Sequence, residues 1–148
     1  LKGSLNCLEL GNIYSKRDWG YAKEYVEVMW KMLQQNEPGD YVLATGINVS
    51  VKEFTEKAFM VLGIQLKWQG IGESEIGINA SNGKIIVRVD PKYYRPTEVE
   101  NLKGDSSLAK RILGWKPKIS FQSMVKEMIE EDLYLSKIEL KKNDIQKR

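Results

Sequence analysis

The sequence predicts a layered fold in which helices alternate with short strands, of the α/β or α+β class. Two observations lead to this prediction. Amphipathic stretches with helical spacing recur along the chain, and short, almost wholly apolar runs of strand length stand between them. The 148 residues suit one domain with one core, and 42% hydrophobic with 29% charged residues is the composition of an ordered globular protein.

The chain starts with a strand-like run at residues 5–10, which no start signal precedes, so we expect the latter part of a longer protein. A helix follows over residues 21–35, with Asp18 as its expected N-cap. Its apolar positions follow helical spacing: Ala22, Tyr25, Val26, Met29, Met32 and Leu33.

Residues 41–45 form an almost wholly apolar run closed by Gly46, which predicts a buried strand. Ser50 and Glu53 then form a capping box that opens a second helix, and Gly63 marks the end of that helix.

Two strands are expected in the middle of the chain, at residues 66–68 and 85–89. Glycine, serine and asparagine are frequent between them, so residues 70–83 are predicted to form a loop.

Two helices are expected after residue 100. Asp105 caps a short helix that Gly114 ends, and Ser120 caps the last helix. An apolar stripe runs along about four turns of that helix and predicts that it faces the core: Phe121, Met124, Val125, Met128, Ile129 and Leu133. Residues 136–148 are a basic tail, interpreted as a solvated helix end or frayed terminus rather than a nucleic-acid site because it lacks interleaved aromatic residues.

The composition excludes several classes of function. One cysteine, Cys7, cannot form an internal disulfide, and a chain without histidine lacks the usual ligands of zinc, copper and non-haem iron. A histidine-dependent nucleophile system is excluded for the same reason. Without an apolar run of membrane-spanning length or a signal peptide, we expect a cytoplasmic protein that binds no membrane.

The stretch Tyr93-Tyr94-Arg95-Pro96-Thr97-Glu98-Val99 has the composition of a binding site. Pro96 stiffens the backbone and favours an extended conformation at Arg95, and a charge between aromatic residues and a proline needs an anionic partner. That partner is a ligand phosphate or, alternatively, Glu98. The two tyrosines are interpreted as packing residues.

Arg17 directly precedes the first long helix, where free backbone N–H groups favour an anion. A surface role is equally open for it, and for Lys16 and Asp18 that plain role is preferred. If both arginines bind ligand, Arg17 and Arg95 could hold the two phosphates of a diphosphate, which would leave Glu98 to accept hydrogen bonds from ribose hydroxyls.

The glycines near residue 70 match no phosphate-binding motif. In residues 70–75 a glutamate replaces the third glycine of G-x-G-x-x-G, and Gly77 is not followed by the lysine of a P-loop. Glu73 and Glu75 are therefore expected to be solvated loop charges. The Tyr-x-x-x-Lys pair of short-chain dehydrogenases does not occur in the chain.

These motifs together resemble the GDP-mannose 4,6-dehydratase family of extended short-chain dehydrogenases/reductases, and specifically its C-terminal portion. The resemblance spans about residues 5–135. Besides the specific run at 93–99, it is carried by residues 10–12, 16–20, 25–27, 29–30, 32–35, 44–46, 89–92, 104–105, 113–117 and 125–128. Tyr21 and Glu24 stand where members commonly have histidine and aspartate.

The resemblance implies an α/β substrate-binding region with the last Rossmann elements, forming a single region over residues 1–148. It implies an NADP-dependent lyase that converts GDP-mannose to GDP-4-keto-6-deoxymannose, on the way to deoxysugars such as fucose. By the same resemblance Arg17 and Arg95 hold the diphosphate, Glu98 meets the guanosine ribose, and Gly11 and Asn12 lie near the nucleotide.

The resemblance also implies what this chain lacks. The residues that bind NADP and those that catalyse the reaction belong to an N-terminal part of the family that precedes this chain, so we expect no activity from the chain alone. The expected partners are GDP-mannose or GDP, and a separate N-terminal half or further copies of the chain. The alternative is a non-catalytic nucleotide-binding or assembly module that complements such a half.

Overall fold

The computed structural model describes residues 7–95, 99 and 102–146, with side chains up to residue 142. Glu98 therefore lies outside the described residues. The elements follow one another as β1 (Leu8–Leu10), β2 (Lys16–Asp18), α1 (Ala22–Leu33), β3 (Asn48–Ser50), α2 (Val51–Val61), β4 (Leu66–Gln69), η1 (Gly72–Ser74), β5 (Ile76–Asn79), β6 (Ile85–Val89), α3 (Ser107–Leu113) and α4 (Phe121–Gln146).

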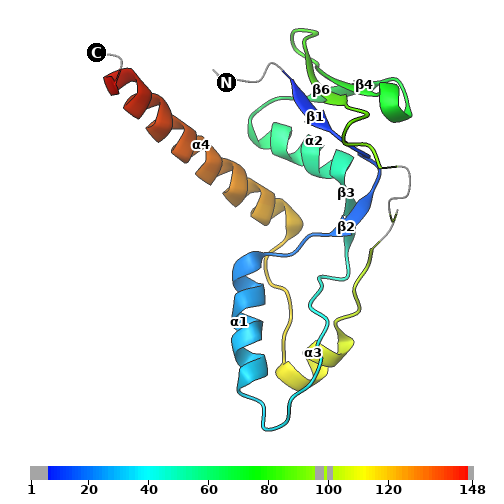
Figure 1. Ribbon diagram of the computed structural model, residues 1–148, viewed down its shortest axis with the longest axis vertical. Helices are drawn as coiled ribbons and strands as arrows, with labels where there is room; N and C mark the ends of the chain where they lie inside the picture. The colour runs from blue at the N-terminus through cyan, green and yellow to red at the C-terminus, as the bar shows by residue number, and fades with distance from the viewer. Residues whose placement is uncertain (1–6, 96–98, 100–101, 147–148) are drawn as a thin grey trace.

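A four-stranded sheet and α2 form one end of the molecule, here called the sheet lobe (Figure 1). The strand order is β1-β6-β5-β4, with β1 parallel to β6 and the other neighbours antiparallel. Val87 and Val89 of β6 and Ile13 after β1 are buried. The predicted strands at 66–68 and 85–89 are confirmed as β4 and β6.

Strand β5 lies inside the predicted loop at 70–83, so that prediction is wrong for residues 76–79. Its glycine and asparagine are typical of turns, but Gly77 is required by packing. A Cβ at Gly77 would stand 3.0 Å from Val87 Cβ and 3.2 Å from Trp68 Cζ3, on the two neighbouring strands. Close approach between strands, rather than a turn, explains this glycine.

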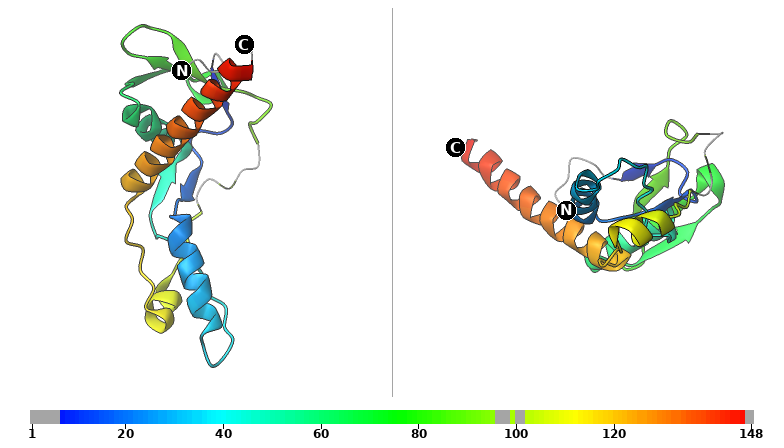
Figure 2. Two further views of the ribbon diagram at one scale, coloured as in Figure 1. Left: turned by 90° about the vertical axis from the view of Figure 1, so that its left-hand side faces the viewer. Right: turned by 90° about the horizontal axis from the view of Figure 1, so that it is seen from below.

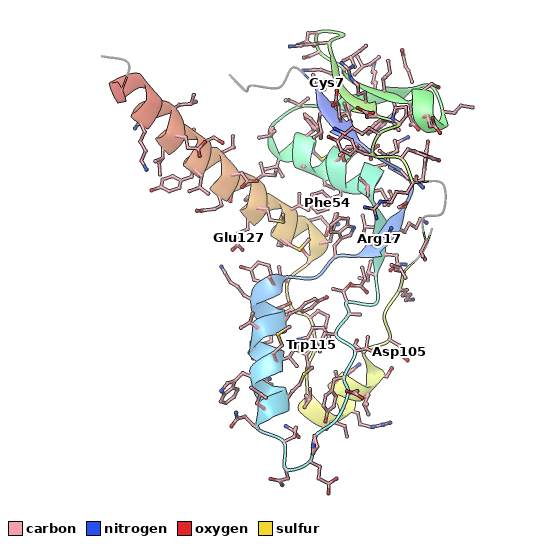
Figure 3. The ribbon with its side chains drawn as sticks, viewed as in Figure 1. Cys7, Arg17, Phe54, Asp105, Trp115 and Glu127 are labelled. Atoms are coloured by element: carbon pink, nitrogen blue, oxygen red, sulfur yellow. The ribbon has the colours of Figure 1, made fainter. Side chains whose placement is uncertain are left out.

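Helices α1 and α3, with residues 41–45 between them, form the other end, here called the helical lobe (Figure 1). Val28 of α1 packs with Ala109 and Leu113 of α3 and with Trp115 in a small core. Trp115 lies between α1 and α3 (Figure 3), and its ring meets that of Tyr25 edge to face with centroids 5.7 Å apart. The antiparallel pair β2–β3 connects the two lobes.

The strand predicted at residues 41–45 is not formed. Tyr41 and Leu43 pack against the core of the helical lobe, whereas Val42 is 55% exposed. A strand is stable only when a neighbouring strand satisfies its backbone groups, and no strand in the described part of the chain pairs with this segment. Only Ala44 of the predicted buried strand is buried, and the pairing that would make the segment a strand is not formed.

Helix α1 is present as predicted, but two details differ. Its N-cap is Tyr21, which makes no side-chain capping bond, so Asp18 is not the cap. The buried position is Val28, whereas a stripe of Val26, Met29, Trp30 and Leu33 is exposed by 52–81%. The helix has apolar residues on two faces, and only one of them is covered.

Three of four further local capping signals were predicted correctly. Ser50 and Glu53 form the expected capping box of α2, and Gly114 ends α3 with φ 61°. The N-cap of α3 is Ser106, without a side-chain capping bond, so Asp105 is not the cap; its Oδ1 accepts a hydrogen bond from the Ser107 backbone N–H at 2.9 Å. Ser120 Oγ accepts one from the Ser123 N–H at 3.1 Å at the start of α4.

The prediction that α4 faces the core over about four turns is confirmed for the first two turns; beyond them Met128 is exposed and Ile129 and Leu133 are only partly buried. Met124 and Val125 are buried, and the rings of Phe121 and Phe54 of α2 lie 5.6 Å apart. From Met128, which is 47% exposed, the helix extends away from both lobes (Figures 1 and 2). None of the helices in the described residues combines the length and apolarity needed to cross a bilayer.

Candidate functional site

The loops after β1 and β6 lie side by side because the two strands are parallel. Leu10 is in register with Val89, and the Asp90 N–H donates to the Leu10 carbonyl at 2.8 Å. Gly11 then passes against Tyr93, where an added Cβ would lie 2.2 Å from the carbonyl oxygen. The structure thus places Gly11 against the motif at 93–99, as a close approach that no larger residue permits.

Arg17 lies in β2, half-buried, at the junction of the two lobes (Figure 3). Its Nη1 donates hydrogen bonds to the carbonyl oxygens of Lys16 and Val99, both at 2.8 Å. Val99 is the last residue of the motif, 82 positions along the chain. The fold thereby brings the Arg17 guanidinium to the C-terminal end of the segment that carries Arg95.

Arg95 follows a turn that Asp90 organises. Asp90 Oδ1 accepts from the Lys92 N–H at 2.8 Å, and its carbonyl accepts from the Tyr93 N–H at 3.0 Å. Arg95 is exposed at the end of this turn. Tyr93 is 49% exposed, so the interpretation of this tyrosine as a packing residue is wrong, while Tyr94 is partly buried.

Asn12 shapes the loop after β1. Its Oδ1 accepts a hydrogen bond from the Tyr14 N–H at 3.0 Å, and its carbonyl accepts one from the Ser15 N–H at 3.4 Å. The side chain of Asn12 therefore organises the backbone next to Gly11 through a local turn.

Asp18 has a different role from the predicted cap. One carboxylate oxygen accepts from the N–H of Thr45 at 2.8 Å and from its hydroxyl at 2.7 Å, and the other accepts from the Gly46 N–H at 2.7 Å. These three bonds fasten the end of residues 41–46 to β2, beside Arg17. The sequence shows Thr45 and Gly46 directly after an apolar run, but it does not show that they bind Asp18, which lies 27 residues before Thr45.

A cluster of Tyr14, Lys52 and Glu75 lies next to these loops and was missed. The expectation that Glu75 is a solvated loop charge is wrong, because its side chain is 2% exposed; Glu73 is exposed as expected. The Glu75 carboxylate accepts from the Tyr14 hydroxyl and pairs with Lys52 Nζ, each at 2.5 Å. No spacing rule links three residues so far apart in the chain.

The described side chains include no group of three or more histidine, cysteine, aspartate or glutamate residues placed to hold a metal ion. Gly70 and Gly72 lie in the connection from β4 through η1 to antiparallel β5, not in a strand-to-helix crossover. This turn does not fit a dinucleotide pyrophosphate, which needs a glycine-rich loop leading into a helix.

The chain matches the model of the family described as GDP-mannose 4,6 dehydratase over residues 1–128. The chain belongs to this family. It is 53% identical over 133 residues to GDP-mannose 4,6 dehydratase of Cricetulus griseus and 52% identical to that of Homo sapiens, and in both cases 90% of this chain is aligned.

The chain spans 36% of the length of each of these two GDP-mannose 4,6 dehydratases. Among solved structures, a UDP-glucose-4-epimerase from Stenotrophomonas maltophila with bound NAD is similar with a TM-score of 0.67 and 17% identity, over 90% of this chain and 37% of that one. The NADPH complex of RMD from Pseudomonas aeruginosa is similar with a TM-score of 0.64 and 18% identity, over 86% of this chain and 36% of that one. These likenesses confirm the α/β fold class.

Proposed function

We propose that this chain is the GDP-sugar-binding part of a GDP-mannose 4,6-dehydratase and that it binds the diphosphate of its ligand between Arg17 and Arg95. The supporting observation is the parallel β1–β6 pair, which sets the two loops at the carboxyl edge of the sheet. Ligands of open α/β sheets bind at such an edge. Family membership supports the choice of a GDP-sugar over other anions.

The two arginines suit a diphosphate for a physical reason. A guanidinium forms paired, charge-assisted hydrogen bonds with phosphate oxygens, and two of them on separate segments can each take one phosphate. Arg17 is held by main-chain carbonyls, whereas Arg95 is exposed at the end of a stiff turn. We assign Gly11 and Asn12 to the nucleotide side of the same site and Glu98 to the ribose.

Titration calorimetry of the chain with GDP tests this proposal. We expect saturable binding that weakens at least tenfold in Arg95→Ala, since a charged hydrogen-bonded contact is worth about 1.5–3 kcal/mol. Arg111→Ala is the matched control, because Arg111 is exposed on α3 in the helical lobe. Absence of GDP binding, or an equal loss in both variants, would contradict the proposal.

We further propose that the enzyme of which this chain is part uses NADP and acts as a lyase on GDP-mannose, with the cofactor and catalytic residues outside this chain. The described glycines do not fit a dinucleotide, so the chain alone is assigned binding and no hydride transfer. Incubation of the chain with NADP and GDP-mannose should yield no 4-keto product. Detection of that product would overturn the assignment.

A second candidate function is assembly with a separate half of the enzyme. Two separate observations favour it: the stripe on the uncovered face of α1 is exposed, and residues 41–45 are an apolar segment that pairs with no strand in the described part of the chain. Surfaces of this kind are usually covered in a working protein.

Co-expression with the part of the hamster relative that this chain does not match tests the second function. We expect a complex that co-elutes in size-exclusion chromatography and that Trp30→Ser weakens, whereas Tyr134→Phe on α4 leaves it unchanged. Separate elution of the two polypeptides would contradict this assembly role.

A further inference from the structure

Glu75 is the one charged residue that is buried within the part of the chain that the structure describes, with 2% of its surface exposed. A buried carboxylate loses its hydration, and that loss must be offset by hydrogen bonds and opposite charge. Its position just before β5 places it beside the end of β6, where the Val89 N–H donates to the Glu75 carbonyl at 3.2 Å.

Two donors satisfy the Glu75 carboxylate from different elements. The Tyr14 hydroxyl donates to Oε2 and Lys52 Nζ contacts Oε1, each at 2.5 Å. Lys52 Nζ also lies 4.8 Å from the centre of the Trp68 ring and 5.2 Å from that of Tyr14. The ammonium group is thereby held between two aromatic rings and a carboxylate.

The electrostatics agree with this geometry. The hydrogen bond to Glu75 raises the pKa of the Tyr14 hydroxyl above its ordinary value. Burial lowers the pKa of Lys52, but the hydrogen bonds and charges of Glu75 and Tyr14 outweigh it and the pKa is raised. The neutral tyrosine and the charged lysine are both favoured at neutral pH.

The cluster joins the two loops of the candidate site. Tyr14 lies in the loop at 11–15, which leads directly into the Arg17 strand, and the first turn of α2 binds that loop from the other side. The Lys52 N–H donates to the Ile13 carbonyl at 2.7 Å, and the Val51 N–H donates to the Ser15 carbonyl at 3.1 Å. Glu75 contacts the end of β6 through its backbone and this loop through its side chain.

We propose that Glu75 is a positioning residue of the nucleotide-sugar site: with Tyr14 and Lys52 it fixes the loop at 11–15 against the end of β6, and so sets the spacing of Arg17 and Arg95. The inference rests on the proposed function. Well-packed apolar residues often stabilise a fold as well as a buried ion pair does, whereas a hydrogen-bonded pair fixes one geometry. The best-attested role of a buried ion pair is to select one arrangement of the surrounding elements over others.

A consequence separates this role from a merely structural one. A diphosphate that bridges two arginines is sensitive to their spacing, whereas a monophosphate bound by one arginine is not. Loosening the cluster should therefore lower the affinity for GDP and leave the affinity for GMP almost unchanged. General destabilisation of the fold would lower both affinities by the same factor.

Calorimetric titration of the chain with GDP and with GMP tests the inference in the wild type, Tyr14→Phe and Glu75→Gln. Tyr14 is 51% exposed, so its variant keeps the fold even if Glu75→Gln does not. For Tyr14→Phe we expect GDP affinity to fall roughly tenfold and GMP affinity to change less than about twofold. Tyr134→Phe, 60% exposed on α4, is the matched control and should change neither.

Hydrogen exchange at the amides of Val51, Lys52 and Val89 reports on the cluster directly, because these amides donate to its loop and to Glu75. Faster exchange there in Tyr14→Phe, with the fall in GDP-to-GMP selectivity, supports the inference. An unchanged GDP-to-GMP ratio in the folded variant overturns it. A wild type that binds no GDP overturns the proposed function itself, and this inference with it.

Discussion

The two lobes differ in how far their backbone and apolar groups find partners within the described residues. In the sheet lobe every strand of β1-β6-β5-β4 has a hydrogen-bonded neighbour, and α2 packs beside the sheet. In the helical lobe α1 and α3 share a core of four buried residues, while the α1 stripe of Val26, Met29, Trp30 and Leu33 faces outward.

This difference assigns ligand binding and assembly with a partner to different regions of the molecule. The candidate site draws on the edge of the β1-β6-β5-β4 sheet, where the loops after β1 and β6 are held by main-chain hydrogen bonds and by the Glu75 cluster. The helical lobe offers apolar surface and an unpaired segment. We therefore expect ligand to bind at the sheet lobe and the adjoining strand β2, and the helical lobe to gain stability from a partner.

The largest expected effect comes from removing the core of the helical lobe. Trp115 is 4% exposed, and Trp115→Ala should lower the free energy of unfolding by about 3–5 kcal/mol, because it removes a large buried side chain and leaves a cavity. If the lobes are distinct, amide exchange will accelerate in α1 and α3 while β5 and β6 keep their protection. Equal loss in both lobes would break the comparison.

A smaller effect is expected at the junction. Asp18→Asn weakens three hydrogen bonds to Thr45 and Gly46, and bonds to a charged group are worth about 1.5–3 kcal/mol. We expect a loss of stability of about that size in urea denaturation, with faster exchange at the Thr45 and Gly46 amides. Asp132→Asn, on the exposed surface of α4, is the control and should leave the free energy of unfolding unchanged. If Asp18→Asn also leaves it unchanged, Asp18 does not fasten residues 41–46 to β2.

The smallest effect concerns the start of α2. Ser50→Ala should lower the free energy of unfolding by about 1 kcal/mol, and Ser50→Thr should restore most of it. The Ser50 N–H and hydroxyl lower the pKa of Glu53 below its ordinary value of 4.5.

The pH dependence of that loss follows from the sign of the shift. A carboxylate with a lowered pKa stabilises the fold above its ordinary pKa, and this contribution disappears as the pH falls through the lowered value. The difference between wild type and Ser50→Ala should therefore be largest near neutral pH and shrink in acid. A difference that grows in acid would show that the capping box is not responsible.

Local signals were read correctly from the sequence. The capping box at Ser50, the glycine end of α3 at Gly114 and the apolar strand β6 depend on residues close in the chain. The elements that were predicted wrongly depend on partners distant in the chain. Residues 41–45 were predicted as a strand from their composition, but strand formation is decided by a neighbour that composition does not specify.

The candidate site divides in the same way. The sequence indicated Arg17 and the motif at 93–99, and the fold brings them together through the Val99 carbonyl. It did not indicate Glu75, because its partners Tyr14 and Lys52 are 61 and 23 residues away and none of the three belongs to a motif. Burial of a carboxylate is a tertiary property, and a glycine-rich sequence around it predicts the opposite.

The most direct test of the account is hydrogen exchange of the whole chain with and without saturating GDP. We expect added protection at residues 11–17 and 89–95, at the carboxyl edge of β1 and β6, and unchanged exchange in α1 and α3. Protection confined to the helical lobe, or no protection anywhere, would contradict the claim that this sheet edge binds the nucleotide.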